Sequence, residues 1–115
     1  MSISNLFKDL DSRDGQERFD ELLRNQGVRI ERIVSHGHAS EPGFWYDQNW
    51  DEWVLVLSGQ AELEYEDRVV RLLPGEYAMI PAGHRHRVKS TSADPPTVWL
   101  AVHWPVREQA QDGAF

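Results

Sequence analysis

The alternation of apolar and polar residues from Val28 onward predicts β-strands. In the stretch 61–66, Ala61, Leu63 and Tyr65 alternate with three glutamates, as in a strand that buries one face. Short apolar runs bounded by turn residues predict further strands over residues 28–35, 53–57, 69–73, 77–80, 86–88 and 97–104. About seven strands at this spacing predict one all-β domain, a sandwich or barrel, rather than alternating strands and helices.

The first 27 residues have a different pattern. Between Gln16 and Asn25, apolar side chains occur at i, i+3 and i+4 (Phe19, Leu22 and Leu23), which predicts a short amphipathic helix. One such stripe is only marginally helical alone, so we expect the helix to pack against the β domain. The expected division is a helical extension over 1–27, the β domain over 28–106 and a fraying tail over 107–115.

Composition and charge narrow the classes of function. A chain of 115 residues with 40% hydrophobic content builds one core, and a formal charge of −7 disfavours binding to nucleic acid or to a membrane surface. Cysteine is absent, which excludes disulfides and thiolate chemistry. The start of the chain has no signal-peptide pattern and no apolar run reaches the ~20 residues of a membrane span, so we expect a cytoplasmic protein.

Two motifs carry candidate chemistry. The first is Gly75, five residues, Pro81-Ala82-Gly83, two residues and His86, a turn, strand and sharp reversal that lead into a strand beginning with histidine. The second is Glu52 followed after six residues by Gly59. Together the two motifs resemble the cupin family over residues 28–104. The resemblance implies a single-domain jelly-roll barrel, usually dimeric, with one metal ion in its mouth.

The chain departs from the family at the metal ligands. Three histidines and one glutamate are common there, and this chain keeps Glu52 and His86. The usual His-x-His pair is replaced by Tyr46 and Gln48 or, with the other spacing, by Trp45 and Asp47; strand parity favours the former. The resemblance implies one divalent ion (iron, manganese, nickel or zinc) held by Glu52, His86 and Gln48.

The pocket is expected to be lined by Tyr46, Gln48, Trp45 and His103. Side chains of the last predicted strand point alternately to two faces. His103 lies on one of them, and the pattern does not say which of the two faces lines the cavity. The His36-Gly37-His38 sequence superficially resembles the missing histidine pair, but its spacing from Glu52 is wrong for the family. We expect it to be a loop.

Two hypotheses of function remain open. In one, the chain is an enzyme acting on a small polar molecule, either through a metal or with Glu52 as the catalytic base of an isomerisation. In the other, it is a non-catalytic small-molecule-binding module that has lost the metal-ligand histidine pair. A homodimer is expected from the resemblance and from the number of tryptophans. The sequence contains no phosphate loop, nucleophile elbow or dinucleotide-binding fingerprint.

Overall fold

The computed structural model describes residues 2–12 and 14–105, and the predicted tail over 107–115 lies outside them. Eight strands occur in the described chain: β1 (Arg18–Asn25), β2 (Val28–Ser35), β3 (Trp50–Ser58), β4 (Ala61–Tyr65), β5 (Val69–Leu72), β6 (Tyr77–Ile80), β7 (His86–Thr91) and β8 (Thr97–Pro105). No helix able to cross a membrane occurs among the described residues.

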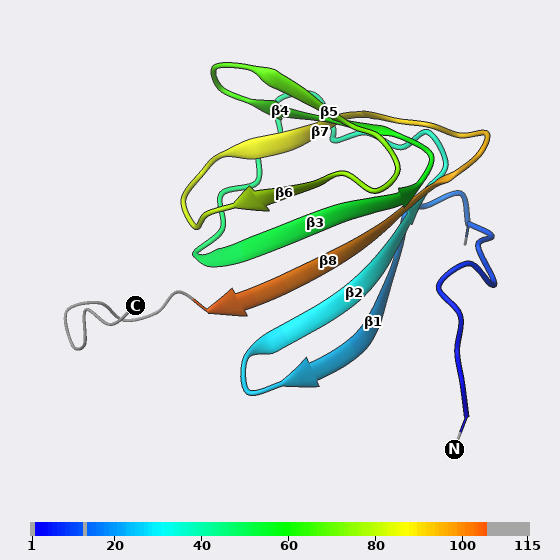
Figure 1. The fold of residues 1–115 in the computed structure, drawn as a ribbon. Helices are drawn as coiled ribbons and strands as arrows, with labels where there is room; N and C mark the ends of the chain where they lie inside the picture. The colour runs from blue at the N-terminus through cyan, green and yellow to red at the C-terminus, as the bar shows by residue number, and fades with distance from the viewer. Residues whose placement is uncertain (1, 13, 106–115) are drawn as a thin grey trace.

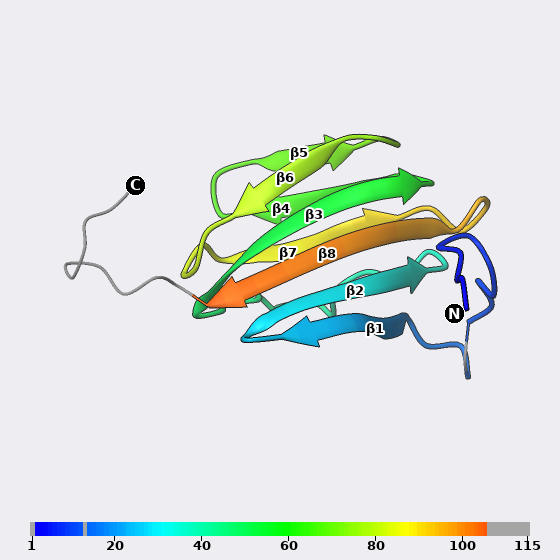
Figure 2. The same ribbon diagram turned by 60° about the horizontal axis from the view of Figure 1, so that its bottom comes forward.

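The strands form two antiparallel sheets, one with the order β1-β2-β8-β3-β6 and the other with the order β5-β4-β7 (Figures 1 and 2). The core lies between the two sheets and is built from alternate residues of the strands, such as Val54 and Val56 of β3, Leu63 of β4 and Trp99 of β8. The predicted all-β class is confirmed. The ladders of the described residues do not join the sheets into a closed barrel, so closure stays a prediction.

The predicted N-terminal helix is wrong, because residues 18–25 form β1 and pair with β2. The turn between them, Gln26-Gly27, has positive φ at both positions (51° and 85°), as in a tight two-residue hairpin turn. A shift of register between Glu21 and Leu23 adds one residue to β1. This bulge breaks the two-residue period and produces the apolar spacing that resembles one face of a helix.

Three strands of the larger sheet place chemistry-bearing residues in one row. Glu52 of β3 is opposite His103 of β8, and His103 is opposite Arg29 of β2. Directly paired residues of neighbouring strands point to the same face. The row therefore lies on the face that also carries the buried Val54 and Trp99.

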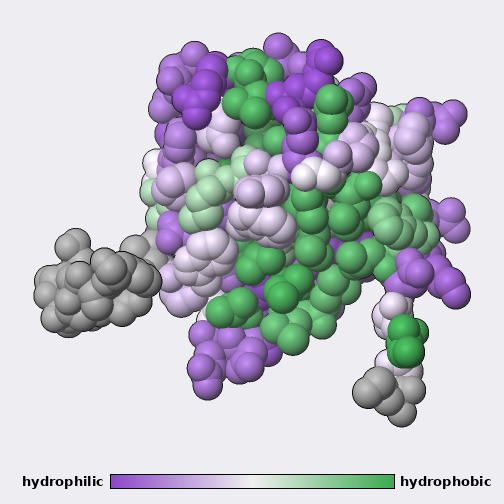
Figure 3. Space-filling view, viewed as in Figure 1, coloured by the Kyte–Doolittle hydropathy of each residue, from purple (hydrophilic) through white to green (hydrophobic). Residues whose placement is uncertain are grey.

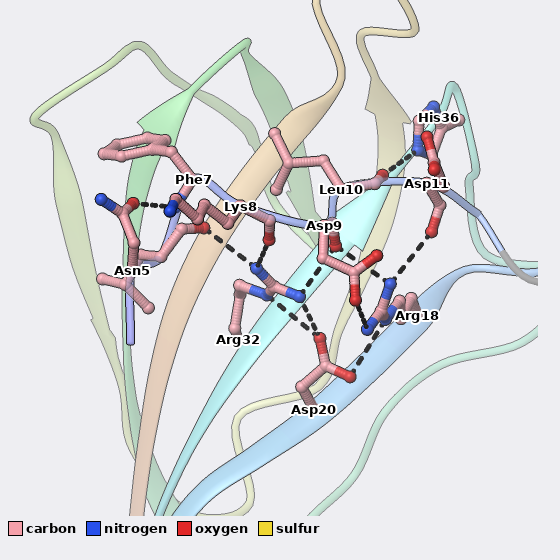
Figure 4. A network of polar contacts seen from close by, with 11 residues as sticks. Asn5, Phe7, Lys8, Asp9, Leu10, Asp11, Arg18, Asp20, Arg32 and His36 are labelled. Carbon is pink, nitrogen blue, oxygen red and sulfur yellow. Dashed lines mark hydrogen bonds and ion pairs between the residues drawn. The ribbon is translucent and has the colours of Figure 1, made fainter. Parts of the chain in front are cut away.

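The segment before β1 is held across the outer side of β2 by Arg32 (Figure 4). The Arg32 guanidinium donates to the carbonyls of Leu6, Lys8 and Asp9 and to the carboxylate of Asp20, at 2.6 Å for the closest Asp20 contact. Arg32 is only 6% exposed. A buried cation with this many acceptors fixes the path of the N-terminal segment.

The two histidines of His36-Gly37-His38 attach the same segment to the domain. The ring Nε2 of His36 lies 2.8 Å from the carbonyl of Leu10, and that of His38 lies 2.9 Å from the carbonyl of Gly15. These histidines belong to the anchoring of the N-terminal segment and do not line the cavity described below.

Gly59, in the turn between β3 and β4, is expected to be far less replaceable than Gly75. Both have positive φ (78° and 89°), but a Cβ on Gly59 would lie 2.5 Å from Ser92 Oγ and 2.7 Å from the carbonyl oxygen of Pro96, whereas one on Gly75 would meet nothing within 4 Å. We expect Gly75→Ala to cost about 1–2 kcal/mol from backbone strain and Gly59→Ala to cost clearly more. Urea unfolding of both variants measures the difference, and equal losses would contradict it.

Candidate functional site

A cavity of about 560 Å³ opens between the two sheets. Its walls come from β1, β2, β3, β6 and β8, from β4 and β7 of the smaller sheet, and from the segment before β3. It is lined by Glu17, Phe19, Arg29, Glu31, Ile33, Phe44, Trp45, Tyr46, Asp47, Gln48, Trp50, Glu52, Val54, Leu63, Ile80, His86, Val88, Trp99 and His103. All the residues that the sequence analysis predicted for the pocket or the metal site line this cavity.

Glu52 and His86 face each other from opposite sheets inside the cavity. The distance from His86 Nε2 to Glu52 Oε1 is 3.8 Å, and the two residues are 4% and 7% exposed, respectively. The other ring nitrogen of His86, Nδ1, donates to the carbonyl of His84 at 2.8 Å. Because a carbonyl only accepts, this bond fixes the hydrogen on Nδ1 and leaves the lone pair of Nε2 facing Glu52.

Tyr46 and Gln48 reach the cavity on the segment that leads into β3. Two backbone hydrogen bonds join Tyr46 to His86, at 2.7 and 3.1 Å, and the carbonyl of Gln48 accepts from Gly83 N at 2.7 Å. The Tyr46 ring is stacked on the His86 imidazole, with 5.4 Å between centroids. The Pro81–Gly83 reversal thus holds this segment beside His86, and the stacked ring restricts the orientation of the imidazole.

His103 lies on the inner face of β8, which settles the question that alternation left open. Its Nδ1 accepts a hydrogen bond from the Trp50 indole at 2.9 Å. An indole N–H only donates, so the neutral His103 ring carries its hydrogen on Nε2. That Nε2–H points between two carboxylates, 3.3 Å from Glu31 Oε1 and 3.9 Å from Glu52 Oε2.

Burial shifts the proton affinities of the facing pair in opposite directions. The pKa of Glu52 is raised above its ordinary value by loss of solvation and then by the negative charge of Glu31, against the opposing effect of His103. Burial also lowers the pKa of His86. A carboxyl group that keeps its proton more readily therefore faces an imidazole that stays neutral, which is an arrangement suited to moving protons.

The donor atoms present form only part of the expected metal centre. Among the described residues, no group of three or more histidine, aspartate or glutamate side chains is placed to hold an ion. Glu52 and His86 supply two donors, the amide of Gln48 is a weak third ligand, and His103 presents an N–H rather than a lone pair. Metal binding through Glu52, His86 and Gln48 therefore stays a prediction.

Glu31, Arg29 and Trp50 are site residues that the sequence reasoning missed. Arg29 and Glu31 are two apart on β2 and share a face with Ile33, so strand alternation could have grouped them. What it could not supply was the pairing of β2 with β8, which places Arg29 opposite His103. Trp50 is the first residue of β3 and is followed by Asp51. No local sequence pattern indicates its hydrogen bond to His103.

Replacing Trp50 by phenylalanine is expected to release the His103 ring from its fixed tautomer. The variant removes the only indole donor to Nδ1 seen among the described contacts, at a cost of about 1–3 kcal/mol for the unpaired acceptor. Nitrogen-15 NMR of the histidine rings should show a single Nε2–H form of His103 in the wild type and a mixture in Trp50→Phe. Trp53→Phe, which changes a ring packed on Tyr77 outside the cavity, is the control. A protonated Nδ1 in the wild type would contradict the assignment.

Comparisons with known proteins agree with the observed fold. A crystal structure of a "putative mannose-6-phosphate isomerase" from Ralstonia eutropha JMP134 is 46% identical and covers 92% of this chain and all of its own, with a TM-score of 0.86. A cupin superfamily protein from Desulfitobacterium hafniense DCB-2 shares the fold at 20% identity, with 84% of each chain covered and a TM-score of 0.71.

The protein TT1209 from Thermus thermophilus shares the fold at 23% identity, with 91% of this chain and 98% of its own covered and a TM-score of 0.73. Among curated proteins, none matches the chain. The cupin-domain profile matches residues 30–103, from Ile30 of β2 to His103 in the row across the larger sheet. The chain with this cavity and its facing Glu52 and His86 therefore belongs to the cupin family.

Proposed function

We propose that this chain is an enzyme that moves protons on a small hydroxy-carbonyl compound, an isomerase-type reaction, with Glu52 as the catalytic base. The observation that carries the proposal is the buried Glu52–His86 pair, 3.8 Å apart, with opposite pKa shifts and an open cavity in front of it. The similarity to the Ralstonia protein, whose name is that of an isomerase, supports the same class of reaction.

In such a reaction a proton leaves the carbon next to the substrate carbonyl and is delivered to the carbonyl carbon, while the proton of the adjacent hydroxyl passes to the former carbonyl oxygen, so that the carbonyl and hydroxyl groups exchange places. Glu52, once ionised, takes the carbon-bound proton, because its raised pKa makes it a stronger base than an exposed glutamate. The lone pair on His86 Nε2 accepts a hydrogen bond from a substrate hydroxyl. His103 donates its Nε2–H to Glu31, and this bond holds the imidazole 3.9 Å from the Glu52 carboxylate.

The test is hydrogen exchange and isomerisation in deuterated water. We expect NMR to show deuterium entering the carbon next to the carbonyl of a hexose or hexose phosphate, together with aldose-to-ketose conversion. Both Glu52 and His86 must be unprotonated, so kcat/KM falls as pH falls, and the acidic limb lies above pH 4.5, the ordinary glutamate value from which the pKa of Glu52 is raised. An absence of exchange in the wild type would contradict the proposal.

The competing proposal is a non-catalytic binding module with the same cavity. It is favoured because no third histidine, aspartate or glutamate joins Glu52 and His86 in a metal-binding group among the described residues. Elemental analysis of protein purified without a histidine tag separates the possibilities that involve metal. Stoichiometric iron, manganese, nickel or zinc that is lost in both Glu52→Ala and His86→Ala would support the ligand set that the family resemblance implies.

A homodimer and a cytoplasmic location stay predictions. Apolar side chains gather on the face of the molecule shown in Figure 3. On β6, Tyr77 and Met79 are 65% and 47% exposed, and Tyr77 packs on Trp53 of β3. A second copy of this chain would bury these side chains, and sedimentation of the purified protein measures whether it does.

A further inference from the structure

Carboxylates dominate the charge around the cavity. Four acidic side chains line it (Glu17, Glu31, Asp47 and Glu52), and Arg29 is the one lysine or arginine among its described lining residues. Three of the acids belong to the wall formed by the larger sheet, namely Glu17 just before β1, Glu31 of β2 and Glu52 of β3, and Asp47 lies on the segment before β3. A multiply charged anion placed in the cavity therefore meets carboxylates along this wall and on the segment before β3.

The charge of Arg29 lies beside one of these carboxylates and an aromatic ring of the same cavity. Its Nε lies 3.8 Å from Glu31 Oε2, and its guanidinium lies 5.9 Å from the centroid of the Trp50 ring. The buried Nε–H has no hydrogen-bond partner among the described atoms. A phosphate group is usually held by several charged donors, whereas Arg29 is a single cation set against four carboxylates on the described lining.

The other cations near the cavity are already engaged. Arg85 and Arg87 lie over the Trp45 ring, at 5.3 and 5.9 Å, but neither lines the cavity. Arg85 pairs with Glu66 at 3.0 Å, and Arg87 pairs with Glu64 at 2.9 Å. Each of these arginines therefore has its own carboxylate.

The rest of the lining suits an uncharged molecule rich in hydroxyl groups. Aromatic rings form much of the wall: Phe44, Trp45, Tyr46, Trp50 and Trp99. Aromatic faces pack against the C–H surfaces of small polar molecules, and carboxylates accept hydrogen bonds from hydroxyls. The negative potential is also felt by Tyr46, whose pKa is raised by burial and then by the charges of Glu17, Glu52 and Glu31.

From this placement of charge we propose that the cavity takes an uncharged hydroxy-carbonyl compound, such as a free hexose, and discriminates against the corresponding phosphate ester. The inference rests on the proposed function and names its substrate class. The proposed substrate therefore differs from the one in the name of the Ralstonia protein, which is a sugar phosphate.

The direct test compares D-mannose with D-mannose 6-phosphate, because the two differ only in the phosphate. Binding is followed by tryptophan fluorescence, since Trp45, Trp50 and Trp99 line the cavity, and turnover is followed by isomerisation to the ketose. We expect mannose to bind at least tenfold more tightly and to have the higher kcat/KM. Equal or tighter binding of mannose 6-phosphate overturns the inference, whether or not either sugar is turned over.

A charge-removing variant links the discrimination to the cavity. Asp47 is exposed and lines the cavity, so Asp47→Asn removes one charge with little effect on packing. It should narrow the preference for mannose about two- to fivefold, the size expected for an exposed charge. Asp67→Asn, in the remote turn between β4 and β5, is the matched control. A preference unchanged in both variants counts against the inference.

A second experiment measures the charge around the cavity without a sugar ligand. In a Trp53→Phe, Trp104→Phe background, caesium and iodide ions quench the fluorescence of the remaining tryptophans, each measured relative to a free tryptophan amide. We expect caesium to quench more effectively than iodide, and Asp47→Asn to reduce the difference. If mannose is bound preferentially but not turned over, the proposed isomerase function fails while the inference about the substrate's charge holds; if neither sugar is bound, or if iodide is favoured, the inference is overturned.

Discussion

Replacing Glu52 by glutamine is expected to lower kcat/KM about 10²- to 10⁴-fold, the usual contribution of a positioned general base, while making the fold more stable at pH 8. The amide keeps the shape of the side chain but cannot accept a carbon-bound proton. It also removes a carboxylate that is 7% exposed and faces the neutral His86. Loss of activity combined with gain of stability distinguishes a catalytic carboxylate from a structural one.

The gain in stability should depend on pH in one direction. Burial raises the pKa of Glu52 in the folded state above the value of 4.5 for a free glutamate. The protonated carboxyl therefore stabilises the fold fully below pH 4.5, and this stabilisation is lost as pH rises through the folded-state pKa. Urea unfolding should show Glu52→Gln more stable than wild type at pH 8 and no more stable at pH 4.

Glu62→Gln is the matched control for this prediction. Glu62 lies on β4, points away from the core and accepts a hydrogen bond from Ser90 at 2.8 Å. We expect this variant to keep its activity and to show no gain in stability at pH 8. If Glu52→Gln were active, or destabilised at pH 8, the carboxylate would be a structural partner rather than the catalytic base.

Replacing Arg32 by methionine is expected to cost about 3 kcal/mol, because it leaves the carbonyls of Leu6 and Lys8 without their donor and removes the closer of the two cations paired with the partly buried Asp20. In a domain of this size such a loss lowers Tm by more than 10 °C, roughly 4–8 °C per kcal/mol. Figure 4 shows that Arg18 also reaches Asp20 and Asp9, so part of the network remains. The segment before β1 should become accessible to proteases.

The double variant Asp20→Leu, Arg32→Met controls for the uncompensated charge. Removing both partners eliminates a carboxylate that has lost its closer cation, so we expect part of the stability to return while the N-terminal segment stays accessible to proteases. Arg24→Met is a surface control, since its pair with Glu21 is exposed and worth little. A Tm for Arg32→Met close to that of wild type would show that the segment does not depend on Arg32.

The β-strands were predictable because their signal is local. Alternation in residues 61–66 predicted β4 with its buried Ala61, Leu63 and Tyr65, and branched residues predicted β2. The N-terminal prediction failed for an equally local reason. The bulge in β1 puts Leu22 and Leu23 out of the two-residue period, and over eight residues a bulged strand and one helical face have the same spacing.

The sequence by itself determined the all-β class, because turn residues and strand period are encoded in neighbouring positions, and its motifs resembling the cupin family singled out Glu52 and His86. Only the tertiary structure decided which face of β8 carries His103 inward, since alternation defines two faces without saying which is buried. It also decided that Trp50 fixes the His103 tautomer and that Glu31 lies beside it. These contacts join residues some 50 to 70 positions apart, and only the pairing of β2, β3 and β8 brings such residues within hydrogen-bond distance.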